Sequence, residues 1–298
     1  MTREISDIVI EAFIALRKEL FNEEGESKQF QLREKRNTQD DPFDEYIHNL
    51  LRENLKDVQC TKAPGPLITP DIVLWRPELL NKISNKAKDT KLIVGMEVKK
   101  LERTKNGKVA RPSGLDYNTT PPCGIIRIYD KDDAPIDIRG YYLFVCLERT
   151  PSRQQYQVTA LTLCDGNVLN QDFSLYLKAV GHREKEIGLG TYGNGANRNR
   201  PMFIFSNPLG AQELDYSVSL IHADANLERL YPSLRLVYEI VRTAKNGETY
   251  TFYCYRLKKD VPESWEVKQL KDPFPVPTRV RETQSRGKFR LPIRIGSG

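Results

Sequence analysis

Three charged residues lie within two short apolar segments of this chain. Asp71 stands directly before Ile72–Trp75, and both Glu97 and Lys99 lie within Ile93–Lys100. The β-branched and aliphatic residues around them are typical of buried strands. A charge among such neighbours costs several kcal/mol unless a partner or a metal compensates for it. The three residues therefore form either a buried ion network or a catalytic site.

The alternation of side chains along a strand favours a catalytic site. Glu97 and Lys99 should emerge on one face into a cleft, while Val98 turns to the core. If the two segments pair antiparallel, the start of the first lies opposite the end of the second, which brings Asp71 next to Glu97 and Lys99. The alternative is that Asp71 caps a turn after Pro70 and that Lys99 is a solvated strand end.

Two converging carboxylates repel each other, and a hard divalent cation relieves that repulsion. Mg²⁺ suits the task because it takes oxygen ligands, keeps several waters and binds phosphate, and Mn²⁺ can substitute for it. The Lys99 ammonium can hold or deprotonate an attacking water and offset charge on the phosphorus. Lys100 lies on the other face, so we expect it to contact a phosphate. The pattern predicts metal-assisted phosphodiester hydrolysis.

These residues also carry a family resemblance. Pro70-Asp71 followed by Glu97-Val98-Lys99 resembles the motif of the PD-(D/E)xK nuclease superfamily, and the chain resembles a type II restriction endonuclease. Asp41–Leu51 resembles the helix that precedes the metal-binding strand in many of these enzymes. Within it, Glu45 matches a helical glutamate that often supports the metal or the water. Ser113–Pro122 resembles a polar segment that follows the ExK strand in a subset of them. The resemblance covers about residues 41–125.

The resemblance implies a sequence-specific, Mg²⁺-dependent endonuclease for double-stranded DNA that leaves 5′-phosphate ends. Asp71 and Glu97 are then the metal ligands, Lys99 orients or activates the water, and Glu45 is an auxiliary ligand. One such site cuts one strand, so cleavage of a palindromic duplex implies a homodimer. We expect neither a membrane partner nor a small-molecule cofactor.

Other functions stay open. The nearest is a DNA repair nuclease or junction resolvase on the same core, although the long second half of the chain suggests additional recognition elements. A catalytically inactive DNA-binding module is a different class, and the intact Asp71, Glu97 and Lys99 disfavour it. A metal-dependent enzyme with a small substrate fits the basic clusters least.

Basic residues cluster in Lys99–Arg111 and again in Arg279–Arg294, and each cluster could follow a phosphate backbone or be an ordinary solvated surface. Gly181–Pro201, rich in glycine, arginine and asparagine, is either a loop that reads bases or a plain surface loop. The candidate DNA contacts are Lys100, Arg103, Asn118, Thr119, Arg183, Asn197, Arg198 and Arg200.

The expected fold is α/β of mixed α+β type, with a restriction-endonuclease-like core in which helices flank a mixed central β-sheet. Residues 1–298 are expected to form a single nuclease domain. Its catalytic core is about 41–165, and 166–298 provides β-rich recognition and dimerisation elements. Helices are predicted at 5–23, 42–54, 171–180 and 227–241. Further strands are predicted at 124–129, 140–148, 156–164, 202–206 and 248–257. Residues 22–36 suggest a loop or an exposed helix, and 60–69 a connector.

Composition restricts the functional classes further. The net charge is +6, and 39% of the 298 residues are hydrophobic, with no run long enough to span a membrane. The N-terminus lacks the layout of a signal peptide, so we expect a cytoplasmic protein. The five cysteines are scattered, none forms a CxxC pair, and the three histidines are not near them at ligand spacing. A structural zinc site is therefore not expected.

Overall fold

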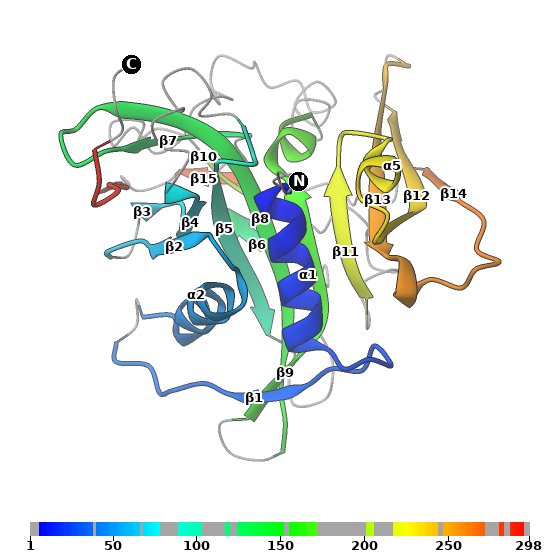
Figure 1. Cartoon of the computed structure of the whole chain (residues 1–298), viewed down its shortest axis with the longest axis horizontal. Coiled ribbons are helices and arrows are strands. Elements are labelled where there is room, and N and C mark those ends of the chain that lie inside the picture. The colour runs from blue at the N-terminus through cyan, green and yellow to red at the C-terminus, as the bar shows by residue number, and fades with distance from the viewer. Residues whose placement is uncertain are drawn as a thin grey trace, which may run out of the picture.

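A large mixed β-sheet forms the centre of the molecule. The computed structural model of the chain describes residues 6–37, 40–65, 68–77, 89–102, 117–119, 124–151, 155–171, 201–205, 217–243, 247–271, 280–282 and 287–294. The sheet has 11 strands in the order β14-β12-β13-β11-β9-β8-β5-β4-β2, with β1 beside β9 and β7 beside β8 (Figure 1). The mixed α/β class predicted from the sequence is confirmed.

Parallel and antiparallel pairs alternate irregularly across this sheet. Its strands are β1 Gln29–Gln31, β2 Gln59–Lys62, β4 Ile72–Trp75, β5 Ile93–Glu102, β7 Ile125–Tyr129, β8 Pro135–Arg149, β9 Gln155–Asp165, β11 Ser217–His222, β12 Leu234–Thr243, β13 Thr249–Leu257 and β14 Lys268–Lys271. Pairing is parallel between β5 and β8, β9 and β11, and β12 and β14, and antiparallel elsewhere.

Two small sheets accompany the large one. In the first, β10 (Pro201–Phe205) lies between β6 (Tyr117–Thr119) and β15 (Val280–Glu282). In the second, β3 (Ile68–Thr69) pairs with β16 (Gly287–Lys288). The second sheet ties the segment just before Asp71 to the C-terminal part of the chain.

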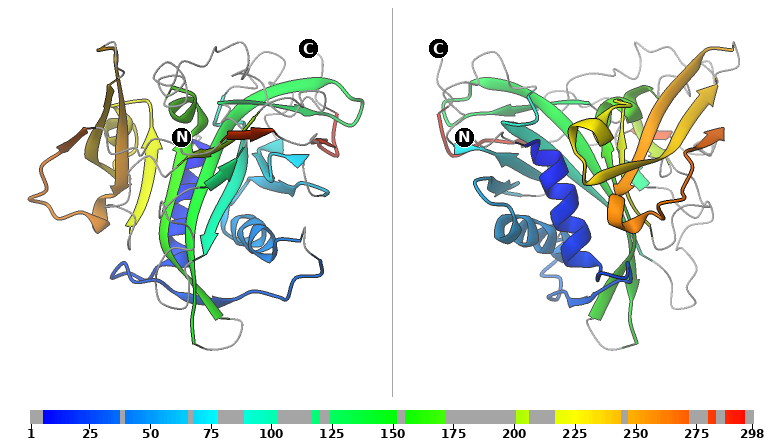
Figure 2. Two further views of the ribbon diagram at one scale, coloured as in Figure 1. Left: turned by 180° about the vertical axis from the view of Figure 1, so that it is seen from behind. Right: turned by 45° about the vertical axis from the view of Figure 1, so that its right-hand side comes forward.

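Helices α1 (Ile8–Leu20) and α2 (Pro42–Asn54) cover one face of the central strands. They lie together in front of the sheet in Figure 1 and stay on that face in the turned view of Figure 2. Their buried side chains share a core with Ile72, Met96 and Val98. The opposite face of β4 and β5 packs in a separate core with β7, β8 and Phe289. Both faces of the two strands are therefore covered by apolar side chains.

Local signals in the sequence set the ends of both helices. Asp7 caps α1 by accepting a hydrogen bond from the Val9 backbone N–H at 2.8 Å, and Asp41 caps α2 in the same way through Phe43 at 3.0 Å. Pro42 occupies the first turn of α2, where its missing N–H has no helical partner to lose. The predicted bounds of α2 are confirmed.

A buried arginine joins α1 to a distant part of the chain. Arg17 is 1% exposed, and its guanidinium donates to both carboxylate oxygens of Asp260 at 2.6 and 2.7 Å. Asp260 ends a 3₁₀ turn, η3 (Lys258–Asp260), that follows β13. The same guanidinium also donates to the Phe21 and Asn22 carbonyls just after α1. This ion pair connects the first helix with the last third of the sequence.

Some predicted elements are wrong. Residues 227–241 contain only the single turn α5 (Leu227–Leu230), followed by β12. A β-bulge between Leu236 and Tyr238 breaks the alternation of β12, so that buried residues at 234, 237 and 238 imitate helical spacing. The predicted connector at 60–69 and the loop at 22–36 contain β2, β3 and β1, which are short strands with few apolar residues.

Other predictions are confirmed. The strands at 124–129, 140–148, 156–164, 202–206 and 248–257 correspond to β7, β8, β9, β10 and β13, and the helix at 5–23 corresponds to the shorter α1. Apart from Gln171, the helix predicted at 171–180 lies outside the described residues. In the described ranges, no helix has both the length and the apolar character to cross a membrane.

The cap of α1 yields a stability prediction. Loss of water around the half-buried Asp7 carboxyl raises its pKa, against the hydrogen bonds from Thr90 and Val9. The fold therefore favours the protonated carboxyl. The free energy of unfolding decreases as pH rises through the folded-state pKa of Asp7. Asp7→Asn should unfold at a higher urea concentration than wild type at pH 7. Asp7→Ala, which lacks the cap, should be about 1 kcal/mol less stable than Asp7→Asn. Equal stability of the two variants would contradict the capping role.

Candidate active site

The pairing of β4 with β5 brings the three predicted residues together. The strands run antiparallel with Ile72 opposite Met96 and Val73 opposite Gly95. One step further along this register, Asp71 lies opposite Glu97. The Asp71 carboxylate is held there, because its Oδ2 accepts a hydrogen bond of 2.7 Å from the Val98 backbone N–H. The predicted antiparallel pairing is confirmed.

Glu97 and Lys99 face the same side of β5, but not an open cleft as expected. The Lys99 Nζ donates to Glu97 Oε1 at 2.7 Å, and the side chains are only 12% and 2% exposed. Apolar side chains from β7 and β8 cover this face. The ammonium is thus held in a fixed position beside a buried carboxylate.

A glycine allows Asp71 to approach β5 closely. Gly95 lies two residues before Glu97 on the same face. A Cβ atom at this position would come within 3.0 Å of Pro70 Cγ and 3.1 Å of Ile138 Cδ1. A side chain here would therefore push Pro70, and with it Asp71, away from Glu97.

The electrostatics at Asp71 are those of a carboxylate pair. Loss of water around the carboxyl raises the pKa of Asp71 well above its usual range, and the charge of Glu97 raises it further. Lys99 and the hydrogen bond from Val98 act in the opposite direction. Without a bound cation, burial and the charge of Glu97 therefore both disfavour a negative charge on Asp71.

A third acid, Asp44 of α2, interacts electrostatically with Asp71. Loss of water, together with the charge of Asp41, raises the pKa of Asp44 to about 7, against Lys99, Lys100 and Lys62. The charge of Asp44 in turn raises the pKa of Asp71. Asp44 is therefore an acid of α2 whose charge affects Asp71, and the sequence analysis did not name it.

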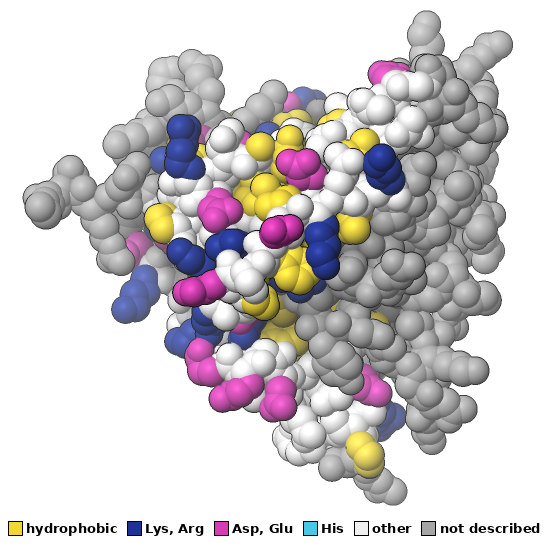
Figure 3. Space-filling view, turned by 90° about the vertical axis from the view of Figure 1, so that its right-hand side faces the viewer, with side chains coloured by type: hydrophobic (Ala, Val, Ile, Leu, Met, Phe, Trp, Pro, Cys, Tyr) yellow, Lys and Arg dark blue, Asp and Glu magenta, His cyan; other side chains and the backbone are white. Residues whose placement is uncertain are grey.

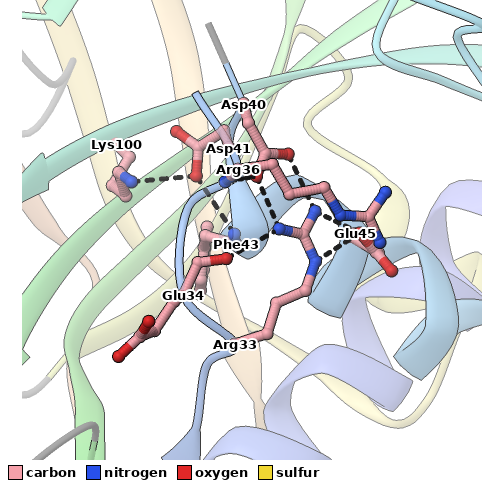
Figure 4. Close-up of polar contacts among 8 residues, drawn as sticks. All are labelled: Arg33, Glu34, Arg36, Asp40, Asp41, Phe43, Glu45 and Lys100. Carbon is pink, nitrogen blue, oxygen red and sulfur yellow. Dashed lines mark hydrogen bonds and ion pairs between the residues drawn. The ribbon is translucent and has the colours of Figure 1, made fainter. Parts of the chain in front are cut away.

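The predicted helical acid, Glu45, lies in a different ion cluster (Figure 4). Its Oε2 accepts hydrogen bonds from Arg33 Nε at 2.9 Å and Nη2 at 2.5 Å, and these lower its pKa. Successive helical residues differ by about 100° in direction, so Asp44 and Glu45 cannot serve the same site. The placement of Glu45 beside Asp71 was wrong.

The direction of α2 could have been found in the sequence. Its buried residues, Phe43, Ile47, Leu50 and Leu51, form one stripe. Glu45 lies almost opposite this stripe, whereas Asp44 lies at its edge. Such an edge position is where a helical acid can reach the boundary between helix and sheet.

Lys100 points to the helical face of β5, as predicted. Its Nζ lies 2.9 Å from Asp41 Oδ1 at the start of α2, and the side chain is 14% exposed. In this structure Lys100 therefore contacts the cap residue of α2. Contact with a phosphate stays a prediction.

Most of the predicted DNA contacts cannot be compared with the structure. Arg103, Arg183, Asn197, Arg198 and Arg200 lie outside the described residues. Asn118 and Thr119 belong to β6, whose backbone pairs with β10.

Charges of both signs are mixed on the described surface. In the C-terminal basic cluster, Arg290 and Arg294 form ion pairs with Asp133 and Asp132. Figure 3 looks onto the side that lies on the right in Figure 1. There, charged side chains of both signs surround a group of hydrophobic ones in the described part. Neither feature marks a surface of one sign.

The donor set fits a magnesium ion better than a softer metal. Asp71 and Glu97 offer carboxylate oxygens, and Mg²⁺ is commonly held by one or two carboxylates together with water and substrate phosphate. Within the described ranges, no three His, Cys, Asp or Glu side chains form a complete metal cage. A site of two carboxylates would therefore leave positions for water and phosphate.

Comparison with known proteins finds no matching family model and no matching curated protein. The geometry of the site is therefore the basis on which a function can be argued.

Cation binding should be visible in thermal stability. Ionised Asp71 destabilises the metal-free fold, so Asp71→Asn should unfold at a higher temperature than wild type at pH 8, with the difference closing toward pH 4. Mg²⁺ at about 100 times its dissociation constant should add about 2.7 kcal/mol to wild-type stability and much less to the variant. Both quantities follow from calorimetric melting curves.

Asp57→Asn is the matched control, because Asp57 is exposed and its positive φ of 59° is tolerated by asparagine. It should melt like wild type with and without Mg²⁺. An equal Mg²⁺ response in Asp71→Asn would exclude Asp71 as a ligand.

Proposed function

We propose that this chain is a sequence-specific, Mg²⁺-dependent endonuclease for double-stranded DNA, of the type II restriction class. The observation that carries the proposal is the position of Asp71, which is fixed against Glu97-Val98-Lys99 by strand pairing and by the Val98 hydrogen bond. This position of Asp71 places two carboxylates and one ammonium close together. This combination suits the hydrolysis of a phosphodiester.

The fold supports the proposal in a general way. A mixed central sheet with helices α1 and α2 against it is compatible with a restriction-endonuclease-like core. Asp71 lies directly before β4, and Glu97 and Lys99 lie in the middle of β5, so two rigid strands hold the candidate residues. Sites built on strands hold their geometry better than sites built on loops.

Each side chain has a defined task in this mechanism. Asp71 and Glu97 would hold the metal, which when bound polarises the phosphate and acidifies a water. Glu97 holds the Lys99 ammonium, so that its charge can orient the attacking water and offset the charge that develops on phosphorus. The P–O3′ bond breaks as water adds, leaving a 5′-phosphate and a 3′-hydroxyl.

The proposed partner is duplex DNA, bound by a homodimer whose two-fold axis coincides with that of the target. Residues 166–298 are proposed to contain the recognition and dimerisation elements. A catalytically inactive DNA-binding module accounts less well for the site, because such a protein would gain stability by losing its repelling carboxylates.

Plasmid cleavage tests the proposal. Wild-type protein with Mg²⁺ should produce discrete fragments whose sequenced ends share one site and carry 5′-phosphates. Lys99→Met should lower the cleavage rate by about 10²- to 10⁴-fold and leave DNA binding largely intact in a gel-shift assay. Lys56→Met, at an exposed position, should leave both unchanged. Absence of any wild-type cleavage with Mg²⁺ or Mn²⁺, or full activity of Lys99→Met, would contradict the proposal.

A further inference from the structure

A row of polar side chains crosses one end of the large sheet. The pairing of β8 with β9 places Tyr141 directly opposite Asp165. The register between the parallel strands β9 and β11 then places His222 beside Asp165. Asp165 and His222 are the last residues of their strands, and Figure 1 shows that α1 begins at the same end of the sheet. In open α/β sheets, the carboxyl ends of parallel strands are a common place for ligand sites.

The positive charge of this row is already paired within the protein. Arg139 of β8 donates from Nη2 to both carboxylate oxygens of Asp165 at 2.7 and 2.8 Å, and the Asn167 backbone N–H donates to the same carboxylate at 2.8 Å. The His222 Nδ1 accepts a hydrogen bond of 3.0 Å from the Asp224 backbone N–H, so in the neutral ring the proton is on Nε2. This Nε2 lies 3.9 Å from Asp165 Oδ2. Arg139 and His222 are therefore both directed at Asp165.

A cavity of about 230 Å³ lies beside this row, between the start of α1, β8 and the segment that follows β11. Its polar lining includes Asp7, Tyr141 and Asp224. Its apolar lining includes Leu227 and Leu230 of α5, and Leu230 is 56% exposed. The volume is below the range that is usual for drug-sized ligands, so the cavity suits a small molecule. It shares no lining residue with the candidate active site.

Two carboxylates of this cavity have no positively charged side chain as a partner. Asp7 caps α1 and accepts from the Thr90 hydroxyl, and Asp224 accepts from the Asn226 backbone N–H at 2.8 Å. In the described part of the chain, no Lys or Arg forms an ion pair with either carboxylate. Asparagine could serve equally well as the cap and in the turn, so neither local role requires a negative charge. Loss of water around Asp7 raises its pKa, so the fold itself disfavours this charge.

The phenol of Tyr141 points to a ligand independently of these acids. Tyr141 lines the cavity, although the residue is only 1% exposed. Among the described residues its hydroxyl has no hydrogen-bond partner, whereas buried tyrosine hydroxyls usually have one. Loss of water also raises the pKa of Tyr141 well above its usual range, so the hydroxyl stays neutral and can both donate and accept. A polar ligand in the cavity would supply the missing partner.

We propose that this cavity binds a small organic cation, namely an ammonium ion with a short apolar body. Such an ion has several N–H donors and no acceptor, which matches the carboxylates of Asp7 and Asp224 and the Tyr141 oxygen. Its carbon skeleton would pack on Leu227 and Leu230. An anion would meet two carboxylates and a guanidinium whose charge is already compensated. The inference is independent of the proposed nuclease function.

Calorimetry with the full chain tests the proposal. The probes are butylammonium and 2-phenylethylammonium at pH 8 and constant ionic strength, and the alcohol and the carboxylate with the same carbon skeletons are the matched ligands. Each ammonium ion should bind once per chain and raise the melting temperature. It should bind at least about tenfold more tightly than the matching alcohol or carboxylate, because only the cation makes charge-assisted hydrogen bonds.

Conservative variants locate the bound ion. Asp7→Asn and Asp224→Asn keep the cap and the turn but remove the charge, and each should weaken binding about 10- to 100-fold. Tyr141→Phe should weaken it about 2- to 10-fold, as expected for a hydrogen bond to a neutral group. Asp57→Asn is the matched control, because Asp57 is exposed and does not line the cavity. It should bind the ammonium ions like wild type.

Ligand-free melting curves separate loss of binding from loss of folding. Asp224→Asn should melt like wild type, and Asp7→Asn should be more stable, so weaker binding in either variant reports on the site itself. The inference is overturned if neither ammonium ion binds, or if the alcohols or carboxylates bind as tightly. Unchanged affinity in both asparagine variants, or an equal loss in Asp57→Asn, would also contradict it. Because no DNA is present in these measurements, failure of the nuclease proposal would leave their outcome unaffected.

Discussion

The register between β4 and β5 is the constraint on which the candidate site depends. A slip of one residue would turn every side chain of β4 to the other face and move Asp71 out of line with Glu97. The apolar residues on both faces of these strands resist such a slip, because each face packs in its own core. The hydrogen bond from Val98 to the Asp71 carboxylate adds a polar restraint at the end of the pair. Packing of the whole core thus fixes the position of three polar groups.

This arrangement places a local instability inside a well-packed structure. Carboxylates with raised pKa values at Asp71 and Asp44 oppose folding at neutral pH, while the cores around them favour it. Lys99 and Lys100 approach the same region from the two faces of β5 and reduce the repulsion. Such a balance is common at functional sites, where activity requires groups that a purely structural protein would not retain.

Patterns in the sequence predicted the parts of the structure that depend on neighbouring residues, such as helix caps and apolar strands. The cap at Asp41 and the proline after it defined α2, and the two apolar runs with their charges defined the β4–β5 pair. The helical acid was assigned to Glu45 from the family resemblance, although the apolar stripe of α2, formed by Phe43, Ile47, Leu50 and Leu51, turns Glu45 away from the sheet. The strand β12 was taken for a helix because its bulge changes the spacing of buried residues. The candidate DNA contacts stay predictions, since a binding surface depends on tertiary structure that no local pattern defines.

The buried pair of Arg17 and Asp260 has a consequence for the modularity of the chain. Its two members come from the first helix and from a turn 243 residues later, and the arginine has almost no contact with water. A fragment that ended after the central strands would leave this guanidinium without its counter-ion, and loss of one partner of a buried ion pair typically costs about 3–5 kcal/mol. The segment that contains Asp71, Glu97 and Lys99 therefore cannot be exchanged as an independent unit. Recombination or truncation between the halves would have to replace both ends of this ion pair together.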